Sequence, residues 1–158
     1  MFAPETTAFV EAGPALIVGT VGTDGAPHAT RGWGLTVLDR GIGELRLLLD
    51  ADDDQARANL VETGAIAITA TDVPTLRSMQ MKGTCTEVAP ATDLDMERSA
   101  RYRDAFFTDI EAIERTPREL PERLAPTALS ACTVRVGELF DQTPGPAAGT
   151  PMQRAGPH

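Results

Sequence analysis

The sequence has little positive charge, few aromatic side chains and only two cysteines. Lys and Arg number 14 against 23 Asp and Glu, which gives a formal net charge of −9 for the 158 residues. Proteins that bind nucleic acid or anionic membranes use clusters of Lys and Arg to neutralise phosphates. The acidic excess and the absence of a basic run therefore argue against nucleic acid and membrane surfaces as partners.

A long hydrophobic run and an N-terminal targeting segment are also missing. No stretch reaches the ~18 apolar residues that a membrane span requires, and no charged region precedes an apolar one at the start. Cys85 and Cys132 lie far apart without metal-ligand spacing, which is typical of buried thiols in a reducing compartment. We expect a cytoplasmic protein, and the abundance of Ala, Gly, Arg and Thr indicates a bacterial genome of high GC content.

Several motifs for catalysis or cofactor binding are absent. We find no Walker phosphate loop, no HExxH, no CxxC, and no GxGxxG between a strand and a helix. Asp50, Asp52 and Asp54 resemble the start of a calcium-binding loop. However, Gln55 stands where that loop needs glycine, and Val61 replaces its closing glutamate. We expect these carboxylates to cap a helix, and we identify no metal site and no catalytic acid or base.

Hydrophobic periodicity predicts a mainly β domain with helices. Asp24-Gly25 marks a tight hairpin turn between the first two strands. Strands are expected at 15–21, 27–38, 44–50, 65–71, 75–88 and 128–141, and helices at 4–12, 53–63 and 92–115. Short connections favour an α+β fold, a six-stranded antiparallel split β-barrel with peripheral helices over residues 1–141. The Pro- and Gly-rich residues 142–158 are expected to form an extended or disordered tail.

Strand alternation separates two faces in residues 76–88. One face is apolar and is expected to join the core; it holds Met79, Met81 and Cys85. The other face holds Ser78, Gln80, Lys82 and Thr84. This row of donors either lines a polar ligand or forms the solvated surface of an antiparallel sheet.

The second strand places glycine on both sides of the only tryptophan, Trp33. Gly32 and Gly34 mark either a bulge at a barrel corner or the close approach of a ligand or another backbone. Alternation puts Arg31 and Trp33 on the same face as Leu35. The Arg31 guanidinium either clamps a phosphate or carboxylate, or pairs with one of the many acidic side chains.

Three segments in order resemble the pyridoxamine-5′-phosphate-oxidase-like, FMN-binding split-barrel families. They are LIVGTVGTDGAPHATRGWGLTV, LRLLLDADDDQARANL and AIAITATDVPTLRSMQMKG. The similarity lies in the strand order around the Asp-Gly turn, the helix that ends Asn59-Leu60, and the strand that carries Gln80 to Gly83. It covers about residues 8–90.

The resemblance implies a homodimer with FMN held in two equivalent clefts at the subunit interface. It places the flavin contacts on the second strand, the end of the third strand, the following helix start and the fifth strand. The implied contact residues are Arg31, Gly32, Trp33, Gly34, Asp50, Ala51, Arg57 and Gln80. Lys82 is added because it shares a face with Gln80.

One segment departs from the family pattern. Many flavin-binding members place Ser or Thr and Lys or Arg after the third strand, where they hold the FMN phosphate. This chain has the acidic segment Asp50–Asp54 there instead. Because carboxylates repel phosphate, Arg31, Arg57 or Arg77 would have to compensate. Otherwise the barrel binds a different ligand or none.

The function that the resemblance implies is a flavin-dependent oxidoreductase of unknown substrate. A non-enzymatic flavin or haem carrier or sensor is an alternative, with His28 as the internal candidate for a haem ligand. A deazaflavin-dependent reductase is another. Pyridoxamine-phosphate oxidase itself is not expected, because the sequence lacks a basic cluster for a second phosphate.

Overall fold

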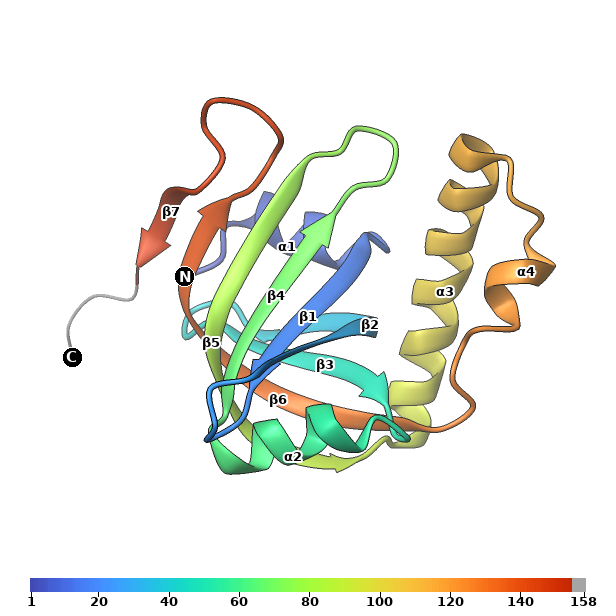
Figure 1. Ribbon diagram of the computed structural model, residues 1–158. Helices are drawn as coiled ribbons and strands as arrows, with labels where there is room; N and C mark the ends of the chain where they lie inside the picture. The colour runs from blue at the N-terminus through green and yellow to red at the C-terminus, as the bar shows by residue number, and fades with distance from the viewer. Residues whose placement is uncertain (155–158) are drawn as a thin grey trace.

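The computed structural model describes residues 1–154, which form a β-barrel with helices around its outside (Figure 1). In sheet order the barrel strands are β3 (Glu44–Asp50), β2 (Pro27–Asp39), β1 (Ala15–Val21), β4 (Ala65–Thr71), β5 (Ser78–Pro90) and β6 (Leu129–Asp141). All neighbours are antiparallel, and pairing of β3 with β6 closes the barrel. The predicted six-stranded antiparallel barrel is confirmed.

The helices and one further strand complete the fold. The helices are α1 (Pro4–Glu11), α2 (Asp54–Glu62), α3 (Asp93–Glu114) and the short α4 (Glu119–Glu122). Figure 1 shows α2 across one end of the barrel and α3 standing beside it, with α4 on the outer side of α3. None of the helices within residues 1–154 is long and apolar enough to cross a membrane.

Two segments differ from the sequence prediction. β5 begins at Ser78, three residues later than expected, because Asp72 and Arg77 close a turn through an N–H donated by Asp72 to the Arg77 carbonyl at 2.8 Å. The predicted tail contains a seventh strand, β7 (Thr150–Arg154), which pairs with the end of β6. The sequence predicted an extended or disordered tail here but not the pairing of this strand with β6.

The interior is filled by apolar side chains of the barrel strands. Leu16, Leu47, Ile68, Met81 and Val134 are each no more than 1% exposed. Met79 and Cys85 are also buried, which confirms the predicted apolar face of β5. Both cysteines are buried thiols without a disulfide, as the sequence predicts.

An ion pair holds α3 against β3. Arg46 Nε and Nη2 donate to the two carboxylate oxygens of Asp95 at 3.0 and 2.7 Å. Asp95 also accepts from the backbone N–H of Thr92, whose hydroxyl in turn accepts from the Asp95 N–H in a capping box at the start of α3. The hydrogen bonds from Arg46, together with those from Thr92, outweigh burial and lower the pKa of Asp95 to about 2.

We predict that Asp95→Asn lowers the free energy of unfolding by about 2 kcal/mol at neutral pH, because a pKa shift from 3.8 to about 2 corresponds to that amount. Since the folded pKa is depressed, this stabilisation is present above pH 3.8 and is lost as the pH falls toward 2. Urea unfolding at several pH values should show that the difference in the free energy of unfolding between wild type and variant becomes smaller in acid. Asp104→Asn, which removes a carboxylate that is 72% exposed, should show no such difference.

Candidate functional site

A cavity of about 390 Å³ lies where β2 and the end of β3 face α3 and α4. Its apolar walls are Trp33, Phe106, Phe107, Ile110, Pro121 and Leu124. Its polar residues are Thr30, Arg31 and Asp50. The fold thus brings together three of the predicted site residues, Arg31 and Trp33 from β2 and Asp50 from the adjacent strand β3.

Arg31 lies at the mouth of this cavity. Its guanidinium carbon is 5.5 Å from the centre of the Phe106 ring, a cation–π arrangement that orients the side chain. Within residues 1–154 it forms no ion pair, so the ion-pair alternative drawn from the sequence is wrong. Arg31 is exposed, and its donors are available to a ligand.

Trp33 forms the floor of the cavity rather than an exposed stacking surface. The residue is 7% exposed, and its ring meets that of Phe107 edge-on, with centroids 6.4 Å apart. The Trp33 carbonyl accepts a hydrogen bond from Ser99 of α3 at 2.7 Å. Both contacts fix the wall that β2 and α3 share.

The glycines around Trp33 serve a bulge and close packing. Gly32 pairs with Leu49 and Leu35 with Leu47, so β2 carries one extra residue between these pairs. Leu35 therefore shares a face with Gly32, and the predicted common face of Arg31 and Leu35 is wrong. A Cβ atom at Gly32 would lie 2.8 Å from the Leu16 Cβ, which explains the glycine without a ligand.

The acidic segment after β3 is organised by hydrogen bonds. Asp53 caps α2, accepting from the Ala56 N–H at 3.0 Å, and His28 Nε2 lies 3.0 Å from both of its carboxylate oxygens. Burial raises the pKa of Asp53, but the hydrogen bonds from His28, Ala56 and Thr30 outweigh it and lower the pKa below its usual value. A carboxylate of this segment thus caps the helix as predicted, but the capping residue is Asp53 and not Asp50, Asp52 or Asp54.

The remaining predicted residues lie away from the cavity or point elsewhere. Arg57 donates to Asp54 at 2.6 Å on the exposed side of α2. Ala51 follows β3, and its N–H donates to the Ala128 carbonyl at 3.0 Å. Gly34 lies under α3, where a Cβ atom would come within 2.9 Å of Leu48. No cluster of His, Cys, Asp and Glu in the described part of the chain suits a metal ion.

Gln80 and Lys82 lie on the outer face of the sheet, and Gln80 is linked to Arg31 by strand register. Successive cross-strand partners form what we call the outer row: Arg31, Ile17, Thr69, Gln80 and Phe140. Cross-strand partners share a face, and three strand spacings place Arg31 about 14 Å from Gln80. Gln80 Nε2 donates to Thr69 Oγ1 at 3.2 Å, and Lys82 Nζ lies 5.0 Å from the Phe140 ring centre.

Sequence reasoning missed the neighbours that complete this surface. Ile17 is 46% exposed although it is an isoleucine in a central strand. Its position between the buried Leu16 and Val18 is the signal that places it on the outer face. Phe106 and Phe107 lie within the helix predicted at 92–115, but the wall that they share with β2 depends on how α3 docks.

Comparison with solved structures decides the fold. No family model and no curated protein matches the sequence. HupZ of Group A Streptococcus superposes with a TM-score of 0.57 at 19% identity, covering 94% of this chain and 100% of HupZ. A candidate pyridoxamine 5′-phosphate oxidase from Lactobacillus delbrueckii gives a TM-score of 0.53 at 20% identity, covering 88% and 93%. This chain has the split-barrel fold.

A third split barrel is an FMN-binding protein from Syntrophomonas wolfei, with a TM-score of 0.52 at 11% identity, covering 94% of this chain and 84% of that one. The resemblance seen in the sequence is thereby confirmed at the level of the fold. Identities this low establish the fold alone. The ligand of this split barrel has to be inferred from its own residues.

Gly83, in the strand that carries Gln80, has a packing role. A Cβ atom there would lie 2.1 Å from the Arg135 carbonyl oxygen and 2.9 Å from the Val136 Cα, both backbone atoms of β6. Neither can move without breaking the β5–β6 pairing. At Gly19, by contrast, a Cβ atom meets nothing closer than the Ala67 oxygen at 3.9 Å.

We predict that Gly83→Ala destabilises the protein by about 2 kcal/mol or more, because the added methyl group forces the two strands apart. The matched substitution Gly19→Ala, also within a strand, should change the free energy of unfolding by less than about 0.5 kcal/mol. Chemical denaturation of the two variants measures this difference. Equal stability of the two would contradict the role assigned to Gly83.

Proposed function

We propose that this split barrel binds a flavin at the interface of a homodimer and acts as a flavin-dependent oxidoreductase. The observation that carries the proposal is the outer row, an uncovered strip of sheet that runs from Arg31 beside the cavity to Gln80. The FMN-binding protein from Syntrophomonas wolfei, which shares the fold, supports FMN as the first flavin to test.

The residues present fit a flavin ring. Ligand sites are largely apolar with a few placed polar groups, and the outer row has this character. Ile17 offers an apolar surface, while Thr69 and Gln80 offer a hydroxyl and an amide. Arg31 at the end of the row offers guanidinium donors to ring carbonyl oxygens. The ring would lie flat on the sheet between Arg31 and Gln80.

The phosphate of FMN does not fit as well as the ring. The acidic segment Asp50–Asp54, of which Asp50 at the end of β3 lines the cavity, carries carboxylates in place of basic side chains. Arg57, the basic residue of this segment, is already paired with Asp54. We therefore derive no step of the reaction through bound FMN.

A second copy of the chain would cover the outer row. Ile17 is 46% exposed, and Phe140 at the other end is only partly buried. Apolar side chains gathered on an open sheet face favour a protein partner over water. A two-fold axis through this face would place the same row of the partner opposite and enclose a planar ring between two sheets.

A bound flavin would supply the electron transfer, and the chain would supply binding, orientation and exclusion of water. The cavity beside Arg31 is the place for a substrate. Its aromatic and aliphatic walls favour a small apolar or aromatic molecule, and Asp50 and Thr30 are the polar groups that such a molecule would meet. No residue among them is assigned as a general acid or base.

The alternatives receive less support from the geometry. His28, the candidate for a haem ligand, directs Nε2 at both oxygens of Asp53, so this nitrogen is not available to iron. A deazaflavin cofactor carries a phosphate and an acidic tail, which meet the same carboxylates as the phosphate of FMN. A flavin without a phosphate, such as riboflavin, avoids this repulsion.

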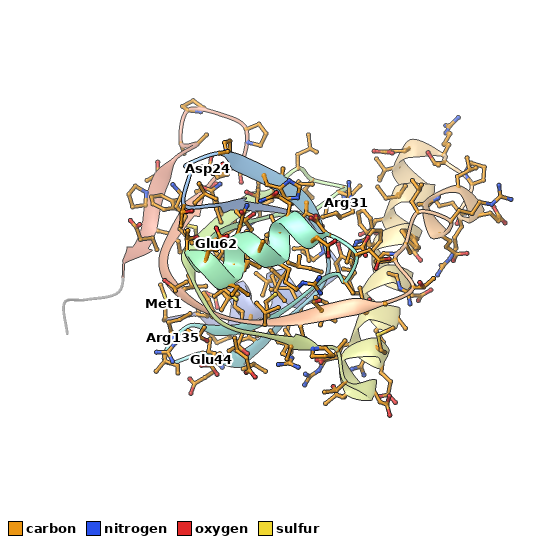
Figure 2. All side chains as sticks on the ribbon, turned by 60° about the horizontal axis from the view of Figure 1, so that its bottom comes forward. Met1, Asp24, Arg31, Glu44, Glu62 and Arg135 are labelled. Carbon is orange, nitrogen blue, oxygen red and sulfur yellow. The ribbon has the colours of Figure 1, made fainter. Side chains whose placement is uncertain are left out.

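We expect purified protein to quench the fluorescence of added flavin. Arg31→Ala should weaken flavin binding about tenfold, since a hydrogen bond to a charged group is lost. Arg135→Ala should leave it within about twofold, because Arg135 is an exposed arginine that pairs with Glu44 on the other side of the molecule (Figure 2). Fluorescence titration measures both. Equal affinities of the two variants would remove Arg31 from the site.

The dimer is tested separately. Ile17→Glu should convert the protein to a monomer in light scattering coupled to sizing chromatography, because it places a charge at the centre of the covered face. Ile42, which is 47% exposed in the β2–β3 turn, is the matched control. A wild-type protein that elutes as a monomer, or an Ile42→Glu variant that dissociates equally, would contradict the proposed interface.

A further inference from the structure

The start of α2 is the helix N-terminus beside the proposed flavin site. His28 and Asp53 join it to β2, and Figure 2 shows Arg31 beyond this end of the helix, with Glu62 at the opposite end. Helix N-termini bind phosphates because their first backbone N–H groups lack partners and carry partial positive charge. Whether α2 can do so depends on what those N–H groups already contact.

The chain itself occupies most of the N–H groups at and just before the start of α2. The N–H groups of Asp52 and Asp53 donate to the Asp50 side chain and carbonyl at 2.9 and 3.2 Å. Asp54 donates to the Asp52 carbonyl at 3.0 Å. Ala56 and Arg57 donate to the side chain and carbonyl of Asp53 at 3.0 and 3.2 Å. The position that a phosphate would take is held by the Asp53 carboxylate.

The surrounding charges also disfavour a phosphate at this position. The segment carries the carboxylates of Asp50, Asp52, Asp53 and Asp54. Arg57 is paired with Asp54, and Arg77 lies elsewhere, over the Phe9 ring of α1 at 5.0 Å. Arg31 is thus the one of the three candidate arginines that reaches the cavity without a carboxylate partner among the described residues. A phosphate monoester carries nearly two negative charges at neutral pH.

We infer that this site selects an unphosphorylated flavin, of the riboflavin type, over FMN. The inference rests on the proposed flavin binding and concerns the ligand's charge. The ring contacts from the outer row are common to both molecules, whereas the phosphate meets Asp50–Asp54 and finds its helix position occupied by Asp53. The acidic segment is therefore a specificity determinant that acts against phosphorylated ligands.

The first test compares riboflavin and FMN by fluorescence titration of the full-length protein. Riboflavin should bind about fivefold or more tightly than FMN at about 20 mM salt, and the ratio should approach one at about 500 mM because salt screens the repulsion. Tighter binding of FMN at low salt would overturn the inference while supporting flavin binding. Absence of binding by both would overturn the proposed function together with the inference.

The second test removes the repulsion. Asp52→Asn combined with Asp54→Asn deletes two charges, releases Arg57, and leaves the Asp53 cap in place. FMN affinity should rise about fivefold, and riboflavin affinity should stay within about twofold.

The matched control combines Asp24→Asn with Glu62→Gln. These two substitutions also remove two negative charges, but near the far end of α2 (Figure 2). The nine-residue helix places Glu62 about 12 Å from Asp54 along its axis, so the control should raise FMN affinity much less than the Asp52/Asp54 variant does and leave riboflavin affinity unchanged. An unchanged ratio of FMN to riboflavin affinity in the Asp52/Asp54 variant, or an equal rise in the control, would overturn the assignment.

Discussion

Pairing of β3 with β6 is the constraint on which the remaining structure depends. β3 has only seven residues, and all of them pair with the first half of β6. This closure seals the interior and places the end of β3, with Asp50, beside β2 and the start of α2. Because β3 is shorter than β6, the second half of β6 extends past it and pairs with β7 instead. The cavity lies near one end of β3, and the uncovered outer row runs from Arg31 beside this cavity across β1, β4 and β5.

Local signals were sufficient to predict most of the fold. The Asp-Gly turn, the hydrophobic periodicity of the strands, and the carboxylates before α2 depend on neighbours in the chain, and each predicted element lies within a few residues of the observed one. The errors came from contacts between distant segments. One extra residue opposite β3 reversed the faces of β2 after Gly32, and nothing in the sequence of β2 alone specifies its register with β3.

The site illustrates the same division. Arg31 and Gln80 could be selected by resemblance, but their common row depends on the pairing of four strands. The cavity depends on the docking of α3, which Arg46, Ser99 and Tyr102 fix through contacts to residues far away in sequence. Conversely, the acidic segment was visible from the sequence, and the structure adds that its carboxylates occupy the helix start.

The position of the two largest chromophores has a practical consequence. Trp33 and Tyr102 are the only residues of their kinds, and both lie between β2 and α3, where the Tyr102 hydroxyl donates to the Pro14 carbonyl at 2.6 Å. Burial raises the pKa of that hydroxyl well above its usual value, so the ring stays neutral in ordinary buffers. Intrinsic ultraviolet emission therefore reports on the contact between β2 and α3. Detachment of α3, or entry of a molecule beside Trp33, would be visible without a label, while events at β7 would leave the spectrum unaltered.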